Sequence, residues 1–179
     1  HITQKNITIN SGAGIQAHIN DLSVNEIIND GTVKLAADAE GTDLQNEIKD
    51  SAETGAKGTL VITSGTVTNN NSLKITQQNL TINEGAGLTT TFDKLSIGAK
   101  DIRNDGILTL SGQTDFTHSV SGEGVLVLEN SDTEVTALTS GGIINNKIWN
   151  EGTLTIDVFN LGGMMVNNGI VRLTMDTTS

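Results

Sequence analysis

The chain has 179 residues, including 25 Thr, 20 Gly and 19 Asn, and it contains no Pro, no Cys and no Tyr. Apolar residues make up 35% of it, which is enough to build a core, and the length suits one domain or one segment of a longer array. The formal net charge is −11 with Lys and Arg scattered singly, so we expect no nucleic-acid partner. The apolar runs are too short to insert into a membrane as a helix, and the absence of Cys excludes disulfides and thiolate chemistry.

The chain opens with a stretch that occurs twice. Residues 2–16 read ITQKNITINSGAGIQ and residues 75–89 read ITQQNLTINEGAGLT, with ten of the 15 positions identical at an offset of 73. The likeness continues downstream, where NDGTVKL at 29–35 matches NDGILTL at 104–110. We therefore predict a single solenoid segment over residues 1–179, made of an internal duplication (2–74 and 75–148) and a remainder (149–179).

A shorter rhythm runs inside the long repeat. A Gly, usually after an acidic or amide residue, opens each run in which Val, Ile, Leu and Thr dominate. Such β-branched runs predict strands, and the tripeptides Asn-Asp-Gly and Asn-Glu-Gly predict turns because Asn and Gly tolerate positive φ. The glycines in question are Gly31, Gly58, Gly106, Gly124, Gly142, Gly152 and Gly169.

One segment carries a helical signal. Thr42 begins a capping-box pattern ahead of DLQNEIKDSAET at residues 43–54, and Leu44 and Ile48 would share a helix face. The second copy lacks most of this segment. We therefore expect a short helical or loop excursion near residues 42–55 that projects from one turn.

Two all-β architectures fit short strands with frequent turns. One is a pair of antiparallel sandwich domains, for which Asp30-Gly31 and Asp105-Gly106 are hairpin signals. The other is a right-handed parallel β-helix, in which each turn of about 18–25 residues shares its core with its neighbours. Residues 1–91 contain no aromatic side chain, which favours the solenoid, because small β-branched residues fill its shared core.

In such a solenoid the second residue after each turn glycine points inward. Strand alternation gives this position the same facing in every copy. We predict equivalent positions in stacked core columns for Val33, Leu60, Leu108, Leu126, Leu154 and Val171.

The strand motifs also carry a family resemblance. NDGILTLSG, GEGVLVLENSD, NEGTLTID and NNGIVRLT resemble the passenger repeats of bacterial autotransporter proteins and related large secreted adhesins. That resemblance implies a right-handed parallel β-helix, secretion to the bacterial cell surface, and a role in adhesion, aggregation or presentation. It also implies a surface protein or a glycan, from the host or from bacteria, as the partner.

No set of reactive residues stands out. The histidines lie at unrelated positions without metal-ligand spacing, so we predict no metal site and no cofactor. A carbohydrate-processing enzyme would need two carboxylates about 5–9.5 Å apart across a groove. The candidate carboxylates are those of Asp21, Asp30, Asp105, Asp115, Glu123 and Glu151. The three histidines without metal-ligand spacing are His1, His18 and His118.

We therefore expect a non-enzymatic passenger segment that acts in adhesion or self-association, or as a stalk, with a carbohydrate-binding or carbohydrate-processing β-helix as the alternative. Trp149, Met164, Met165 and Phe159 gather near the C-terminal end as a thickened core or a partner patch. The net charge predicts a monomer at low salt, with weak self-association through polar faces as salt screens the repulsion or as pH falls.

Overall fold

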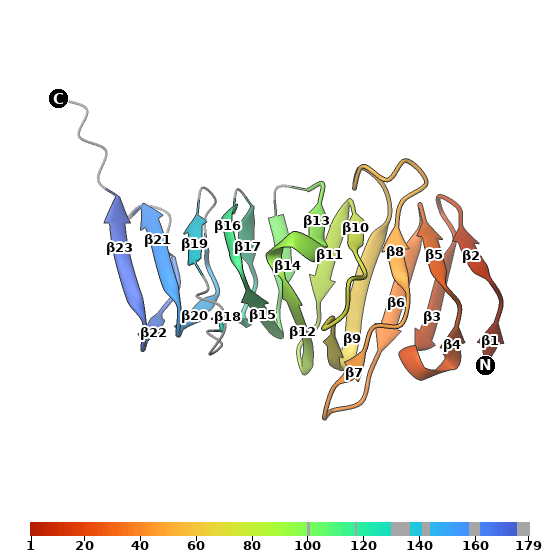
Figure 1. The fold of residues 1–179 in the computed structure, drawn as a ribbon, viewed down its shortest axis with the longest axis horizontal. Coiled ribbons are helices and arrows are strands. Elements are labelled where there is room, and N and C mark those ends of the chain that lie inside the picture. Colours follow the sequence, from red (N-terminus) through yellow and green to blue (C-terminus); the bar gives the residue numbers. More distant parts are fainter. Residues whose placement is uncertain (100, 117, 130–136, 141–143, 158–161, 175–179) are drawn as a thin grey trace.

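The structure of the chain is a computed structural model, and it describes residues 1–99, 101–116, 118–129, 137–140, 144–157 and 162–174. Parallel strands stack along one long axis and form a β-solenoid of about seven turns (Figure 1). Every strand pair within these residues is parallel, so the pair of antiparallel sandwiches is wrong. Asp30-Gly31 and Asp105-Gly106 do not form hairpins, because each joins two strands that lie on neighbouring faces.

Where the structure describes a whole turn, the turn passes through three faces, and the strands of one face pair with those of the turns before and after. The long strand β9 (Thr59–Thr68) bends from face III into face I and so joins these two faces into one sheet. Face I holds the pair β1 (Ile2–Thr3) and β4 (Leu22–Ser23), then β7 (Thr42–Asp43), the second half of β9, β12 (Ala86–Thr91), β15 (Ile107–Ser111), β18 (Val125–Leu128), β20 (Lys147–Asn150) and β22 (Met165–Asn167).

Face II consists of two sets of strands that lie in one row in Figure 1. The first set is β2 (Asn6–Ile9), β5 (Glu26–Asn29), β8 (Glu47–Lys49), β10 (Ile75–Gln77) and β13 (Leu95–Ile97), and the second is β16 (Gln113–Phe116), β19 (Ala137–Ser140), β21 (Thr153–Asp157) and β23 (Ile170–Thr174). Face III holds β3 (Gly14–His18), β6 (Thr32–Ala36), the first half of β9, β11 (Asn79–Ile82), β14 (Asp101–Asn104) and β17 (Ser119–Ser121).

Within the described residues, helix is confined to two single turns, η1 (Ile19–Asp21) and η2 (Phe92–Lys94). No helix in the described part of the chain is long and apolar enough to span a membrane.

The expected helix at residues 43–54 is wrong. Strand β8 lies within that segment, and Leu44, Asn46, Ile48 and Asp50 are buried in alternation with more exposed neighbours, as in a strand. The loop alternative holds for residues 50–58, which project from the corner between faces II and III.

This loop makes the turn between β8 and β10 longer than the two turns before it. Ile7 pairs with Ile27, and Ile27 pairs with Ile48, at similar steps along the chain. Ile48 pairs with Ile75, which is a longer step because it includes the loop. The additional residues therefore sit outside the stacked strands and leave their register intact.

The core consists of aliphatic columns that run along the inside of each face. Of the six predicted core residues, five are completely buried and Val171, in the last described strand, is half-buried. They belong to three columns, not one, because the Gly-led strands recur on different faces. Val33 and Leu60 lie on face III, Leu108 and Leu126 on face I, and Leu154 and Val171 on face II.

The duplicated sequence explains this change of face. β2 lies on face II and its copy β11 on face III, whereas β3 lies on face III and its copy β12 on face I. The offset between the two copies therefore corresponds to three turns and one further face. The same local sequence builds the same strand and corner on whichever face it meets.

Glycine at these corners is required by close packing. A Cβ atom on Gly31 would lie 2.2 Å from the carbonyl oxygen of Ala13, and one on Gly106 would lie 2.1 Å from that of Ala86. Neither glycine has a positive φ, so the conformational reason predicted from the Asn-Asp-Gly pattern is wrong. The backbone of the preceding turn leaves no room for any side chain.

Candidate functional site

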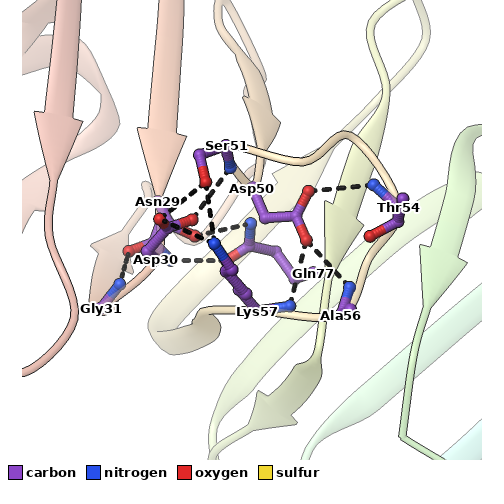
Figure 2. A network of polar contacts seen from close by, with 9 residues as sticks. All are labelled: Asn29, Asp30, Gly31, Asp50, Ser51, Thr54, Ala56, Lys57 and Gln77. Carbon is purple, nitrogen blue, oxygen red and sulfur yellow. Dashed lines mark hydrogen bonds and ion pairs between the residues drawn. The ribbon is translucent and has the colours of Figure 1, made fainter.

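A network of polar contacts supports the loop at residues 50–58 (Figure 2). Asp50 is completely buried, and its carboxylate accepts hydrogen bonds from the backbone N–H groups of Thr54, Ala56 and Lys57 at 3.0, 2.9 and 3.0 Å. The carboxylate thus holds the loop from the inside, since a buried charge is stable only when such donors surround it.

Asp30 contacts the same loop from the neighbouring turn. It accepts hydrogen bonds from the backbone N–H of Ser51 at 2.9 Å and from its hydroxyl at 2.8 Å, and Lys57 Nζ lies 3.6 Å away. The two Ser51 hydrogen bonds, with help from Lys57, lower the pKa of Asp30. Asn29 also donates a hydrogen bond to Gln77 within this network. The polar groups of the network therefore satisfy one another, and the network stabilises the fold.

Three carboxylates line one depression at another corner, between faces III and I. They come from three successive turns, and two of them, Asp105 and Glu123, are candidates from the sequence. An open depression of about 650 Å³ is lined by Thr63, Asn83, Glu84, Asp105 and Glu123.

Asp105 is already engaged in this depression. Its Oδ1 accepts the backbone N–H of Glu123 at 3.1 Å, and its Oδ2 accepts from Arg103 Nε at 2.8 Å. These contacts hold the pKa of Asp105 below its ordinary value. The general acid of a glycosidase needs a raised pKa, so Asp105 does not fit that role.

Two other candidate carboxylates, those of Asp21 and Glu151, are not among the residues that line the depression. The Asp21 carboxylate, in η1, lies 3.7 Å from His1 Nδ1, and Glu151 accepts a hydrogen bond from Trp149 Nε1 at 3.0 Å. Asp115 belongs to β16, but its side chain lies outside the described part of the structure.

The structure does not bring the histidines together. His18 Nε2 lies 3.4 Å from the Asp38 carboxylate, and His118 Nε2 lies 2.6 Å from the carbonyl oxygen of Ile97. Among the residues that the structure describes, no group of three His, Cys, Asp or Glu side chains is placed to hold a metal ion.

Apolar side chains gather on the outside of face I. In register along this face, one outward column contains Ile107 and Val125, and the next contains Val127, Trp149 and Val166. Met165 pairs with Ile148. Met164, one residue earlier, therefore lies beside Lys147, which belongs to the first column. We call this surface the outer strip: Ile107, Val125, Val127, Trp149, Met164 and Val166.

Four of the six residues of the outer strip are exposed, and Val125 and Val127 are half-buried. The exposed fractions of Ile107, Trp149, Met164 and Val166 are 51%, 45%, 72% and 54%. The expected self-association through polar faces stays a prediction, although four large apolar side chains are exposed on the outer strip. A contiguous exposed apolar surface of this kind is typical of an interaction site.

Earlier turns of the same columns are polar. Thr68, Thr89 and Thr109 align on three successive turns, but the neighbouring column reads Thr66, Gly87 and Ile107. Face I therefore changes along the axis from Thr and Gly to the apolar outer strip.

Sequence reasoning found part of this surface. It identified Trp149 and Met164 as a possible partner patch, whereas Met165 points inward against the core and Phe159 lies outside the described residues. It missed Ile107, Val125 and Val127, because only the register shows that they join Trp149. It also missed Asp50, which continues the alternation of inward-pointing residues after Ile48 and could have been recognised from that position.

The fold defines the chain as a β-solenoid protein. In comparisons with known proteins, no protein-family model, no curated protein and no solved structure matches it. The resemblance to autotransporter passengers therefore rests on the strand motifs alone.

Proposed function

We propose that the chain is a non-enzymatic segment of a secreted or surface-exposed bacterial adhesin, which acts in adhesion or self-association, or as its stalk. The observation that carries this proposal is the outer strip, an exposed apolar surface on a stacked scaffold. A solenoid suits this role because its repeated turns form an extended flank on which contacts add along the axis. The autotransporter-like motifs support secretion to the cell surface.

An attachment assay tests this function. Beads coated with the parental chain should aggregate with one another or attach to bacterial or host cell layers. The double variant Trp149→Thr with Val166→Thr should reduce this binding about tenfold, because it places in the column the residue found at 68, 89 and 109.

The matched control is Val61→Thr, which changes a half-buried outward valine on face III. It should leave binding unchanged, and circular dichroism should show that all variants fold. Coated beads that bind no better than bare beads would overturn adhesion and self-association and leave the stalk role. A double variant that binds like the parent would show that the outer strip does not carry the binding.

The acidic depression favours carbohydrate binding or processing as the second candidate. Glu84 and Glu123 are exposed there, beside the Thr63 side chain, and such groups suit hydrogen bonds to sugar hydroxyls. A glycan array with the parental chain and the variant Glu84→Gln with Glu123→Gln tests it. Retention of a glycan by the parent and its loss in the variant would support this candidate, whereas equal signals would reject it.

A further inference from the structure

We propose that the outer strip is the interface of a weak homodimer in which two solenoids lie side by side, related by a two-fold axis parallel to their long axes. This inference deepens the self-association in the proposed function by naming the surface, the partner and the geometry. It rests on the outer strip together with the charges on its two sides.

The charges are arranged about Trp149. Lys147, Trp149 and Glu151 are alternate residues of one turn, and the strand pairing to the turn before extends through the Glu151 N–H, which donates to Leu128 O at 3.0 Å. The contact between Trp149 Nε1 and Glu151 Oε1 at 3.0 Å places this carboxylate beside the indole ring. An exposed cation thus flanks the tryptophan on one side and an exposed carboxylate on the other.

This arrangement is self-complementary under one symmetry. A two-fold axis parallel to the solenoid axis and passing by Trp149 reverses strand direction, so the column of Val127, Trp149 and Val166 faces itself and Lys147 faces Glu151 twice. The same rotation sets Val125 opposite the exposed Glu129 of the second copy. A two-fold axis parallel to the strands would instead place the Lys147 column against itself. Charge complementarity therefore favours the first arrangement. It also points to a second copy of this chain as the partner that covers the outer strip.

The interface is small, so we expect weak association. The outer strip spans four strands, β15, β18, β20 and β22, or about 15 Å at the usual strand spacing. Such an area belongs with transient contacts, and the net charge of −11 per chain opposes the dimer until salt screens it. Dimers should accordingly form at high protein concentration and physiological ionic strength.

Charge reversal tests the geometry by sedimentation equilibrium. K147E and E151K should each weaken dimerisation by about threefold to tenfold, because each places like charges opposite one another. The double variant K147E/E151K should restore it to within about threefold of the parent, since the pairs re-form with opposite polarity.

Net charge alone predicts another result. K147E makes the chain more acidic and E151K makes it less acidic, so repulsion between whole molecules would weaken association in the first and strengthen it in the second. Stronger association of E151K, or a parental chain that stays monomeric at every concentration, would overturn the proposal.

Crosslinking provides a second test, because the natural chain has no cysteine. Val127 lies in the column that faces itself, and facing sheets lie about 10 Å apart, which is beyond a direct disulfide. Val127→Cys should therefore be linked into a dimer by a short bismaleimide crosslinker. Thr81→Cys, an outward position on face III, should not. Equal crosslinking of both variants would reject the geometry.

The two proposals fail separately. A monomeric chain whose beads still attach through the outer strip would end the homodimer but leave the proposed function in place. A dimer whose beads attach to no cell layer would keep the homodimer and the self-association, and would end the adhesion to other surfaces.

Discussion

At the scale of single residues, buried asparagines connect one turn of the solenoid to the next. Asn104 accepts the Gly106 N–H at 3.2 Å and donates to the carbonyl oxygen of Val125, one turn on, at 3.0 Å. Asn29 does the same with Gly31 and Thr59, both at 3.1 Å. Both asparagines are completely buried, so each amide satisfies backbone groups that would otherwise lack partners.

Asn104→Ala should therefore reduce the free energy of unfolding by about 2–4 kcal/mol, because it leaves buried backbone groups unsatisfied. Urea unfolding monitored by circular dichroism measures this. Asn83→Ala is the matched control, since Asn83 is an exposed asparagine at an equivalent corner, and it should change stability by less than about 0.5 kcal/mol. Equal losses in the two variants would contradict the proposed role of burial.

Asp105 should contribute to stability in a pH-dependent way. Its pKa is lowered in the folded chain by the Glu123 N–H and then by Arg103. Its contribution is therefore fully present above the ordinary value of 3.8 and is lost as pH falls from there through the lowered pKa of the folded chain. Asp105→Asn should lower the melting temperature at neutral pH, and the difference from the parent should shrink below about pH 4. A difference that stays constant across a pH series would contradict this assignment, and Glu84→Gln serves as the control in the same depression.

At the scale of strands and loops, neighbouring residues of one strand meet opposite environments. Leu126 is completely buried between Leu108 and Ile148 on the inside of face I, whereas Val127 points outward in the outer strip. One backbone step therefore separates a core position from a surface position.

Leu126→Asp should bury an unpaired charge and destabilise the chain by more than about 4 kcal/mol, with the turns around β18 unfolding. Val127→Asp introduces the same side chain one residue later and should cost far less. Chemical denaturation of the two variants compares them, and a Leu126→Asp chain that unfolds like the parent would show that the core assignment is wrong.

The side chain of Asp50 holds the loop at residues 50–58 from the inside, while Asp30 contacts it from the neighbouring turn. Asp50→Ala should remove the three acceptor contacts and lower stability by about 2–4 kcal/mol, while Asp50→Asn, which keeps one carbonyl acceptor, should lose less. Limited proteolysis of the loop provides the readout, since the alanine variant should be cleaved faster. Equal cleavage of the parent and both variants would remove Asp50 from this role.

At the scale of the whole molecule, stability should vary along the axis. In the first turn the inward Ile7 and Ile15 are only half-buried, whereas their partners Ile27 and Val33 in the next turn are at most 1% exposed. Each turn of a solenoid contacts only its neighbours, so a turn with one neighbour is held less firmly than a turn with two.

Native-state hydrogen exchange should therefore show faster exchange in β2 and β22 than in β11 and β15 near the middle. The comparison uses amides that donate within strand pairs, so that exposure alone does not decide the result. Uniform protection along the axis would show instead that the chain unfolds as one cooperative unit.

The sequence by itself determined the class of fold, because its signals are local. Gly-led β-branched runs made strands and corners, and the lack of aromatic residues before Phe92 favoured a core shared between turns. The helix predicted at residues 43–54 was wrong because Leu44 and Ile48 stand at i and i+4. This spacing fits one face of a helix and also one side of a strand. The buried Asn46 and Asp50 concealed the alternation that the strand requires.

The tertiary structure alone decided which residues meet across turns. The step along the chain between strand partners is short from Thr153 to Ile170 and much longer from Ile48 to Ile75, so no fixed period aligns the turns. The outer strip therefore forms from side chains that only the register brings together. The face on which each copy of the repeat lies was set in the same way, because loop lengths accumulate along the chain until they add up to one further face.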